Sequence, residues 1–242
     1  MCTVAFIPKG NQYYFASLRD EDPARTPALI PGVHSSGDGC YLAPTDGKAG
    51  GTWIGISVSG SIIILLNGGF KDHQRHPAYR KSRGLIVAEL LLANFPVAQW
   101  QLIDTDAIEP FTLIVFEANN LFELVWDGTV KHCKKLQNCQ PYIWSSATLY
   151  SPAAKLHRQQ LFDNWMTRNE AISASSVLNF FKLNDDKENG FIIHRNNKMQ
   201  TLSYSFITLD SNQHAVMQYY DLSNFSQHSK VLQLKISDKE FV

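Results

Sequence analysis

Cys2, directly after the initiator methionine, is the residue of this sequence whose chemistry is easiest to state. Methionine aminopeptidases generally remove the first methionine when the second residue is small, and removal here would leave a thiol and a free α-amino group on one residue. Their reference pKa values, about 8.5 and about 7.7 to 8.0, suit proton transfer at neutral pH. The thiolate is a strong nucleophile, and the amine can serve as its base. A cysteine here is more often an ordinary strand residue, so a catalytic Cys2 needs partners.

Charged residues that could act as such partners follow the second predicted strand. The segments 3–7 and 13–18 are apolar and aromatic and flank a Lys-Gly-Asn turn, which predicts a hairpin. Arg19, Asp20 and Asp22 come directly after it, where the hairpin would bring them beside the N-terminal residue. A guanidinium there would stabilise a thiolate, and a carboxylate would hold the ammonium of the α-amine. A charged turn after a strand is the simpler interpretation of this segment by itself.

Asn67 is the candidate for stabilising negative charge on a substrate. It ends the predicted strand 62–66 and precedes Gly68 and Gly69. An asparagine at the end of a buried strand can present its side-chain NH₂ to a developing oxyanion, and glycines let the main chain approach a ligand closely. A plain hairpin with an Asn-Gly turn is the commoner use of such a pair.

A basic segment, 68–83, separates this asparagine from a predicted helix at 84–94, for which Ser82 is the expected N-cap. Its charged residues and histidines are Lys71, Asp72, His73, Arg75, His76, Arg80, Lys81 and Arg83. Cations and a helix N-terminus both favour an anion, so Arg75 and Arg83 are candidate contacts for a carboxylate or phosphate. A solvated loop explains the segment equally well. The two histidines have no third ligand at a suitable spacing, so no metal site is predicted.

The remaining elements fall into blocks of antiparallel strands with helices between the blocks. The segment 19–51 is rich in Pro, Gly, Asp and Ser and is predicted to be mostly loop. Residues 111–117, 121–126, 129–132 and 141–144 predict a four-stranded meander. The other predicted elements are strands at 53–58, 191–194, 201–209, 215–220 and 230–236 and helices at 152–167 and 173–182. This order predicts an α+β protein, in which two antiparallel sheets pack together under covering helices, as a single domain over residues 1–242.

Composition argues against several classes of function. Lys plus Arg and Asp plus Glu are both 22, so the formal net charge is zero and nothing favours nucleic acid as a partner. No apolar run approaches the roughly 20 residues of a membrane helix, and the first residues do not resemble a secretory signal. The 4 cysteines include no CxxC pair. We therefore predict neither a disulfide framework nor a zinc site, and we expect a cytoplasmic protein with free thiols and no cofactor.

Taken together, these motifs resemble the NRDE family, also called the transport and Golgi organisation protein 2 family. The resemblance is strongest over residues 1–95, and its motifs are Met1-Cys2-Thr3, Arg19-Asp20-Glu21, Gly50-Gly51-Thr52-Trp53-Ile54-Gly55-Ile56, Asn67 and Ser82-Arg83-Gly84-Leu85. It implies a four-layer αββα Ntn-hydrolase-like sandwich, similar to bile-salt hydrolases and penicillin V acylases, which also begin Met-Cys-Thr.

The resemblance also implies roles for individual residues. The residues that match the nucleophile, its supporting charges and the oxyanion donor are Cys2, Arg19, either Asp20 or Asp22, and Asn67. Three features depart from the pattern. Leu18 replaces the asparagine that precedes Arg-Asp-Glu in the family, and Ser146 stands where a second asparagine is expected. No residue matches the late arginine of the acylases. Loss of one oxyanion donor costs roughly 100- to 1,000-fold in rate.

Two hypotheses of different kinds follow. The first is an N-terminal-cysteine amidohydrolase that cleaves a non-peptide C–N amide bond of a small substrate, which could carry an anionic group. The second is a non-enzymatic binding or trafficking protein for a lipid- or haem-like ligand on the same fold, because family members have been linked to membrane traffic and to lipid or haem handling. The expected partner is a small-molecule amide in the first case and a hydrophobic anion in the second.

Overall fold

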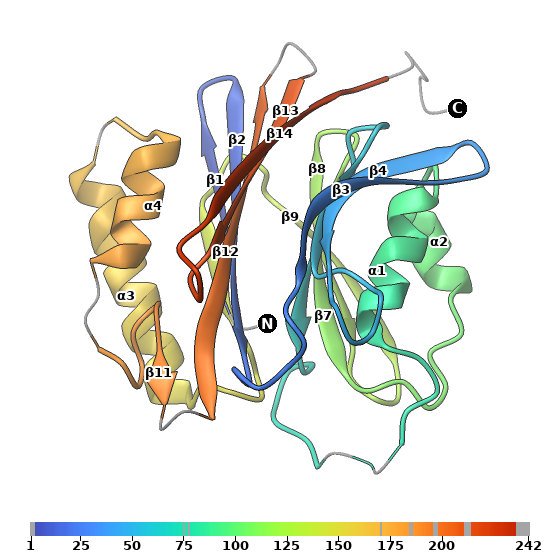
Figure 1. The fold of residues 1–242 in the computed structure, drawn as a ribbon, viewed down its shortest axis with the longest axis horizontal. Helices are drawn as coiled ribbons and strands as arrows, with labels where there is room; N and C mark the ends of the chain where they lie inside the picture. Colours follow the sequence, from blue (N-terminus) through green and yellow to red (C-terminus); the bar gives the residue numbers. More distant parts are fainter. Residues whose placement is uncertain are drawn as a thin grey trace.

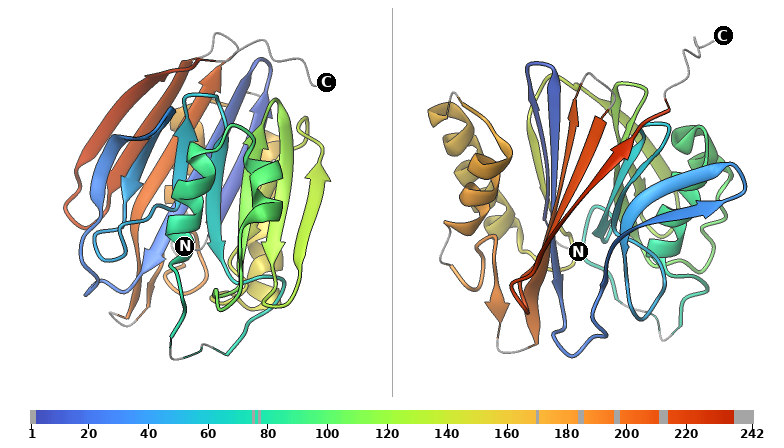
Figure 2. Two further views of the ribbon diagram at one scale, coloured as in Figure 1. Left: turned by 90° about the vertical axis from the view of Figure 1, so that its right-hand side faces the viewer. Right: turned by 45° about the horizontal axis from the view of Figure 1, so that its top comes forward.

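Two antiparallel sheets stacked face to face form the centre of the protein (Figure 1, Figure 2). The computed structural model describes residues 3–74, 76, 78–169, 171–183, 186–195, 198–210 and 214–235. Within this part of the chain a pair of helices covers the outer face of each sheet. The predicted four-layer αββα arrangement is confirmed.

The first sheet contains the N-terminal hairpin. Its strands, in spatial order, are β10 (Tyr142–Ser145), β1 (Thr3–Lys9), β2 (Gln12–Glu21), β12 (Met199–Asp210), β13 (His214–Asp221) and β14 (Gln227–Gln233), with β11 (His194–Arg195) paired to β12. β1 and β2 pair as predicted, and Thr3 lies opposite Leu18. Gly10 turns the chain between them with a φ of +60°, which glycine adopts without strain.

The second sheet joins consecutive strands side by side. They are β3 (Leu29–Ser36), β4 (Gly39–Thr45), β5 (Ile54–Ser57), β6 (Ile62–Asn67), β7 (Phe111–Glu117), β8 (Asn120–Trp126) and β9 (Lys131–Leu136). β7 occupies the predicted residues, and β8 begins one residue before its predicted start. In the turn between them Ala118 and Asn119 have φ values of 47° and 59°, the sign that a two-residue hairpin turn of type I′ requires.

The prediction that residues 19–51 are mostly loop is wrong. β2 continues through Glu21, and β3 and β4 occupy much of the remainder. β3 is an edge strand, which tolerates Pro31 because one side of an edge strand forms no ladder hydrogen bonds. Consequently Arg19 and Asp20 lie inside a strand and not in a turn after it.

Several other elements also differ from the prediction. The segment 141–144, predicted as the last strand of the meander, is β10 and pairs with β1 of the first sheet, where Tyr142 lies opposite Phe6. The predicted strands 129–132 and 230–236 are displaced to β9 and β14, and 191–194 is displaced to β11, which has only two residues. The pattern also misses α2 (Pro96–Leu102), because seven residues are too few to show a clear helical period.

Four helices complete the sandwich in the described part of the chain. α1 (Arg83–Leu92) and α2 cover the second sheet, and α3 (Pro152–Arg168) and α4 (Ala174–Lys182) cover the first, so the layers run across Figure 1 from left to right as helices, sheet, sheet and helices. Ser82 occupies the predicted N-cap of α1, although its side chain makes no capping hydrogen bond. No helix among the described residues has the length and apolar composition needed to cross a membrane.

Strand alternation decides which side chains face the site. Along β2, Phe15 belongs to the core between the two sheets, whereas Tyr14 and Leu18 belong to the core under α3 and α4. Successive side chains of a strand point to opposite faces. Arg19 therefore shares the inner face with Phe15, and Asp20 shares the outer face with Leu18.

Candidate active site

A cleft of about 1260 Å³ opens where several strands of the two sheets end. The first sheet contributes the end of β2 with the turn that follows it, and the second contributes the segments after β4 and β6. The start of α1 forms another part of the wall. Of the residues predicted for the site, those that line this cleft are Arg19, Asp20, Asp22, Asn67 and Arg83. Cys2 and Arg75 lie outside the described residues.

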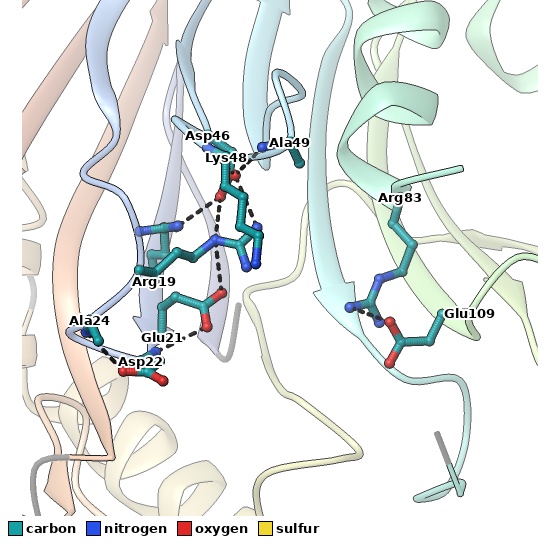
Figure 3. Close-up of polar contacts among 10 residues, drawn as sticks. Arg19, Glu21, Asp22, Ala24, Asp46, Lys48, Ala49, Arg83 and Glu109 are labelled. Carbon is teal, nitrogen blue, oxygen red and sulfur yellow. Dashed lines mark hydrogen bonds and ion pairs between the residues drawn. The ribbon is translucent and has the colours of Figure 1, made fainter. Parts of the chain in front are cut away.

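Arg19 is the buried cation of the cleft. Its side chain is 4% exposed, and its Nη2 donates to Oδ2 of Asp46 over 2.8 Å (Figure 3). The guanidinium carbon also lies 4.7 Å from the centre of the Trp53 ring, in a cation–π contact. Both partners come from the second sheet or the segments beside it, so Arg19 is held across the interface between the sheets.

Asp46 is the residue of this site that the sequence did not identify. It follows β4 and accepts hydrogen bonds from Nε and Nη2 of Arg25, both at 3.0 Å, and from the main-chain N–H groups of Lys48 and Ala49, at 3.1 and 2.8 Å. Burial alone would raise its pKa. The hydrogen bonds from Arg25 and Ala49 and the charges of Arg25 and Arg19 outweigh burial and lower the pKa to about 2. Asp46 is therefore ionised over the whole physiological range.

The two acids predicted as partners of the α-amine take different places. Asp20 lies on the outer face of β2 and accepts hydrogen bonds from Tyr150, at 2.9 Å, and from Oγ1 of Thr201, at 2.5 Å. Asp22 follows the strand, and its Oδ1 accepts from the main-chain N–H of Ala24 over 2.8 Å. Strand alternation thus separates Asp20 from Arg19, although the two residues are neighbours in sequence.

Asn67 ends β6 at the wall of the cleft, as predicted. Its main-chain oxygen accepts a hydrogen bond from Oγ of Ser146 at 2.9 Å. Ser146 is 1% exposed and also lies 3.1 Å from Oγ1 of Thr148. The hydroxyl of Ser146 therefore holds the main chain of Asn67 in place, and Ser146 is not among the residues that line the cleft.

Gly68 serves the turn after β6. Its φ is +83°, and a Cβ there would lie 2.8 Å from Cγ2 of Thr148. Its N–H donates to the main-chain oxygen of Pro110 over 3.0 Å, and its own oxygen accepts from Oγ1 of Thr112 over 3.0 Å. Close packing and a left-handed backbone explain this glycine, which is not among the residues that line the cleft.

The basic segment before α1 is extensively ion-paired. Nη2 of Arg83 lies 2.9 Å from Oε2 of Glu109 (Figure 3), and its Nη1 donates to the main-chain oxygen of Pro110. Other ion pairs join Arg80 to Asp104 and Lys81 to Glu89. These acids all lie outside the segment, so they compensate much of the positive charge that the sequence places there.

Nε2 of His73 is 3.4 Å from Oε1 of Glu109. Within the described residues no group of three or more His, Cys, Asp or Glu could hold a metal ion.

Two glycines from separate motifs meet in the wall of the cleft. A Cβ on Gly51 would lie 2.3 Å from the carbonyl carbon of Gly84, and a Cβ on Gly84 would lie 2.9 Å from the oxygen of Thr52. The N–H of Thr52 donates to the oxygen of Gly84 over 3.0 Å. The Gly-Gly-Thr-Trp motif and the motif at the start of α1 therefore interlock, and this contact sets Trp53 beneath Arg19.

Solved structures with this architecture include enzymes. The chain is similar to a cysteine-to-alanine variant of the conjugated bile acid hydrolase from Clostridium perfringens, with a TM-score of 0.61 and 9% sequence identity over 95% of this chain and 92% of that chain. It is also similar to the Caenorhabditis elegans ortholog of N-acylethanolamine-hydrolyzing acid amidase, with a TM-score of 0.59 and 11% identity over 85% of this chain and 92% of that chain. No curated protein matches the chain in sequence.

These likenesses, at such low identity, establish the fold. It is that of the Ntn-hydrolases, with an open cleft where the strands of both sheets end. The chain belongs to the Transport and Golgi organisation 2 family, whose sequence model matches residues 1–220. The resemblance seen in the N-terminal motifs is thereby confirmed and extends well beyond them.

Proposed function

We propose that this protein is an N-terminal-cysteine amidohydrolase that cleaves a non-peptide C–N amide bond of a small substrate. The observation that supports the proposal best is Arg19, a buried guanidinium fixed in an open cleft beside the end of the N-terminal hairpin. An ionised group kept in such a place is a common feature of sites that stabilise charge during a reaction.

The register of the hairpin supports a nucleophile close to Arg19. Thr3 lies opposite Leu18, and residue 2 is joined to Thr3 by one peptide unit, which spans about 3.8 Å between Cα atoms. Val4 and Phe6 belong to the core between the sheets, on the same face as Arg19. We propose that the thiol of Cys2 works together with this guanidinium, which the labelling experiment below tests.

The proposed reaction uses the chain's own groups in two steps. After loss of Met1, the thiol of Cys2 attacks the amide carbonyl carbon while its proton passes to the α-amine, and Asn67 donates its side-chain NH₂ to the oxyanion. The C–N bond then breaks, and the α-amine returns the proton to the departing amine, leaving a thioester. Water, deprotonated by the α-amine, hydrolyses the thioester to a carboxylic acid and restores the thiol.

Arg19 would act on the first of these steps. A cation near a thiol favours the thiolate and lowers the thiol pKa. Low exposure of the guanidinium strengthens this effect, because water screens a buried charge poorly.

The first prediction tests the nucleophile. In the purified protein we expect intact-mass analysis to show that Met1 is absent, and site-resolved peptide mapping to show that iodoacetamide labels Cys2 several-fold faster than Cys133 at pH 7. Cys133 is an exposed free thiol, which makes it an internal reference. Retention of Met1, or labelling of Cys2 no faster than of Cys133, would reject the proposed mechanism.

A second candidate function is favoured by one observation. The hydroxyl of Ser146 is committed to the main chain of Asn67, so the residue in place of the second asparagine supplies no donor to the cleft. A protein without that donor could retain the cleft for binding a lipid- or haem-like hydrophobic anion, with Trp53, Leu65 and Met199 among its walls. Binding would then survive in the Cys2→Ala variant, which calorimetric titration with haemin or a fatty acid would measure.

A further inference from the structure

We infer that Asp46 is the positioning residue of this site, which acts by holding the guanidinium of Arg19. This inference rests on the proposed function. The carboxylate reaches Arg19 from the opposite sheet and is saturated with donors: Oδ2 accepts from Arg19 and from Nε of Arg25, and Oδ1 accepts from Nη2 of Arg25 and from two main-chain N–H groups of its own turn.

The turn makes this carboxylate a rigid anchor. Lys48 and Ala49 donate their N–H groups to Oδ1 over 3.1 and 2.8 Å, and Gly50 donates to the main-chain oxygen of Asp46 over 2.9 Å. In addition, the N–H of Asp46 donates to the oxygen of Gly51 over 2.7 Å. A side chain fixed in this way can impose an orientation on a long and flexible partner such as arginine.

Arg19 is held in a way that leaves donors available. Nη2 is committed to Asp46, whereas Nε and Nη1 donate to no acceptor among the described residues. The ring of Trp53 supports the guanidinium plane at 4.7 Å. Asp46 and Trp53 together thus fix the cation while sparing part of its hydrogen-bonding capacity for a thiolate or a bound ligand.

A positioning role and a simple charge effect predict opposite results. If Asp46 were only a nearby negative charge, the Asp46→Asn variant would lose that charge, and the thiol pKa of Cys2 would fall. If Asp46 holds Arg19 in place, the same variant frees the guanidinium, the thiolate loses its cation, and the thiol pKa rises. The side-chain oxygen of asparagine can still accept from the N–H groups of the turn. The hydrogen bonds that are lost are those that Oδ2 accepts from Arg19 and Arg25.

The experiment measures site-resolved iodoacetamide labelling of Cys2 between pH 5 and 9 in the full-length protein. We expect Asp46→Asn to raise the apparent thiol pKa and to slow labelling at pH 7 by about 3- to 10-fold, since one pKa unit changes the thiolate fraction about tenfold. Arg19→Ala should slow labelling at least as much. In the Arg19→Ala background, Asp46→Asn should add no further decrease.

Two more variants keep the result interpretable. Asp127→Asn is the matched control, because Asp127 also has a pKa of about 2 and accepts main-chain N–H groups of a turn but is not among the residues lining the cleft. Asp127→Asn should be labelled like the unmodified protein. Asp46→Glu keeps the carboxylate and should restore part of the labelling rate, which keeps the test decisive if Asp46→Asn folds poorly. If the thiol pKa in Asp46→Asn is unchanged or lower while Arg19→Ala still slows labelling, the positioning role of Asp46 is rejected and the proposed function is not. No effect of Arg19→Ala overturns the proposed function itself.

Discussion

At the scale of single residues, the site depends on a contact between residues distant in sequence. The sequence pattern draws attention to the acids beside Arg19, but its ion pair is with Asp46, 27 residues later. Asp20 instead accepts hydrogen bonds from Tyr150 and Thr201. Successive side chains of a strand point to opposite faces of the sheet, so neighbours in sequence are the residues least able to share one face.

Asp46 also links stability to pH. Its pKa is lowered in the folded state to about 2 from a reference value of 3.8, so its stabilising contribution is complete above about pH 4 and is lost as the pH falls through 2. We expect this contribution to be about 1 kcal/mol, because water screens part of the interaction. Urea unfolding of the unmodified protein and of Asp46→Asn at pH 5 and pH 2.5 measures it, and the difference in free energy of unfolding should shrink at the lower pH. A constant difference would contradict the pairing.

Sequence reasoning located residues of the cleft better than it located their contacts. Arg19 and Asn67 line the cleft, and both were singled out by local patterns, a charged triplet after an apolar segment and an Asn-Gly pair. Asp46 could not be singled out in this way, because its role depends on the packing of one sheet on the other. The main-chain contact of Ser146 is equally invisible, since a serine in sequence does not reveal its acceptor.

At the scale of elements, the position of α1 depends on the absence of two side chains. Gly51 and Gly84 let the start of α1 and the segment before β5 touch, main chain to main chain. The same contact brings Thr52 and Trp53 to the cleft wall. The family motifs at these positions therefore have a packing explanation.

The Gly51→Ala substitution tests this contact. The new Cβ would lie 2.3 Å from the carbonyl carbon of Gly84, and the nearby atoms are main chain and cannot move aside easily. We expect a loss of about 1 to 3 kcal/mol in the free energy of unfolding, as for other overpacked sites. Gly32→Ala is the matched control, because its Cβ would meet only Nε2 of His34 at 3.8 Å. Similar losses in the two variants would count against the interlock.

Elements with a clear hydrophobic pattern were predicted from the sequence, and elements without one were not. β7 has seven consecutive buried residues, and its strand could be located from sequence. β3 contains Pro31 and Gly32 and exposes Leu29 and Val33, which hides a strand from any test of alternation. β10 was located, but its partner was not, because pairing with β1 is a property of the whole fold.

At the scale of the molecule, an aromatic cluster joins the two sheets. The ring of Phe116, from the second sheet, lies 4.7 Å from Tyr13 and 5.5 Å from Phe15, both from the first. The sheets also meet near β14, where the N–H of Lys235 donates to the oxygen of Val58 over 2.7 Å. The arrangement of the cleft depends on these contacts, since Arg19 lies in β2 of the first sheet and Asp46 directly follows β4 of the second.

Phe116→Ala therefore tests the connection between the core and the cleft. Phe116 is 4% exposed, and removal of a buried phenylalanine ring costs about 3 to 5 kcal/mol in the free energy of unfolding. We expect urea unfolding to show this loss, and labelling of Cys2 at pH 7 to slow in the folded variant, because a looser interface weakens the hold of Asp46 on Arg19. Phe225→Ala is the control, since Phe225 is 87% exposed and its removal should change stability by less than about 0.5 kcal/mol. If stability falls in Phe116→Ala while the labelling rate does not, the cleft is held by its local contacts alone, and the packing of the two sheets is not what positions Arg19.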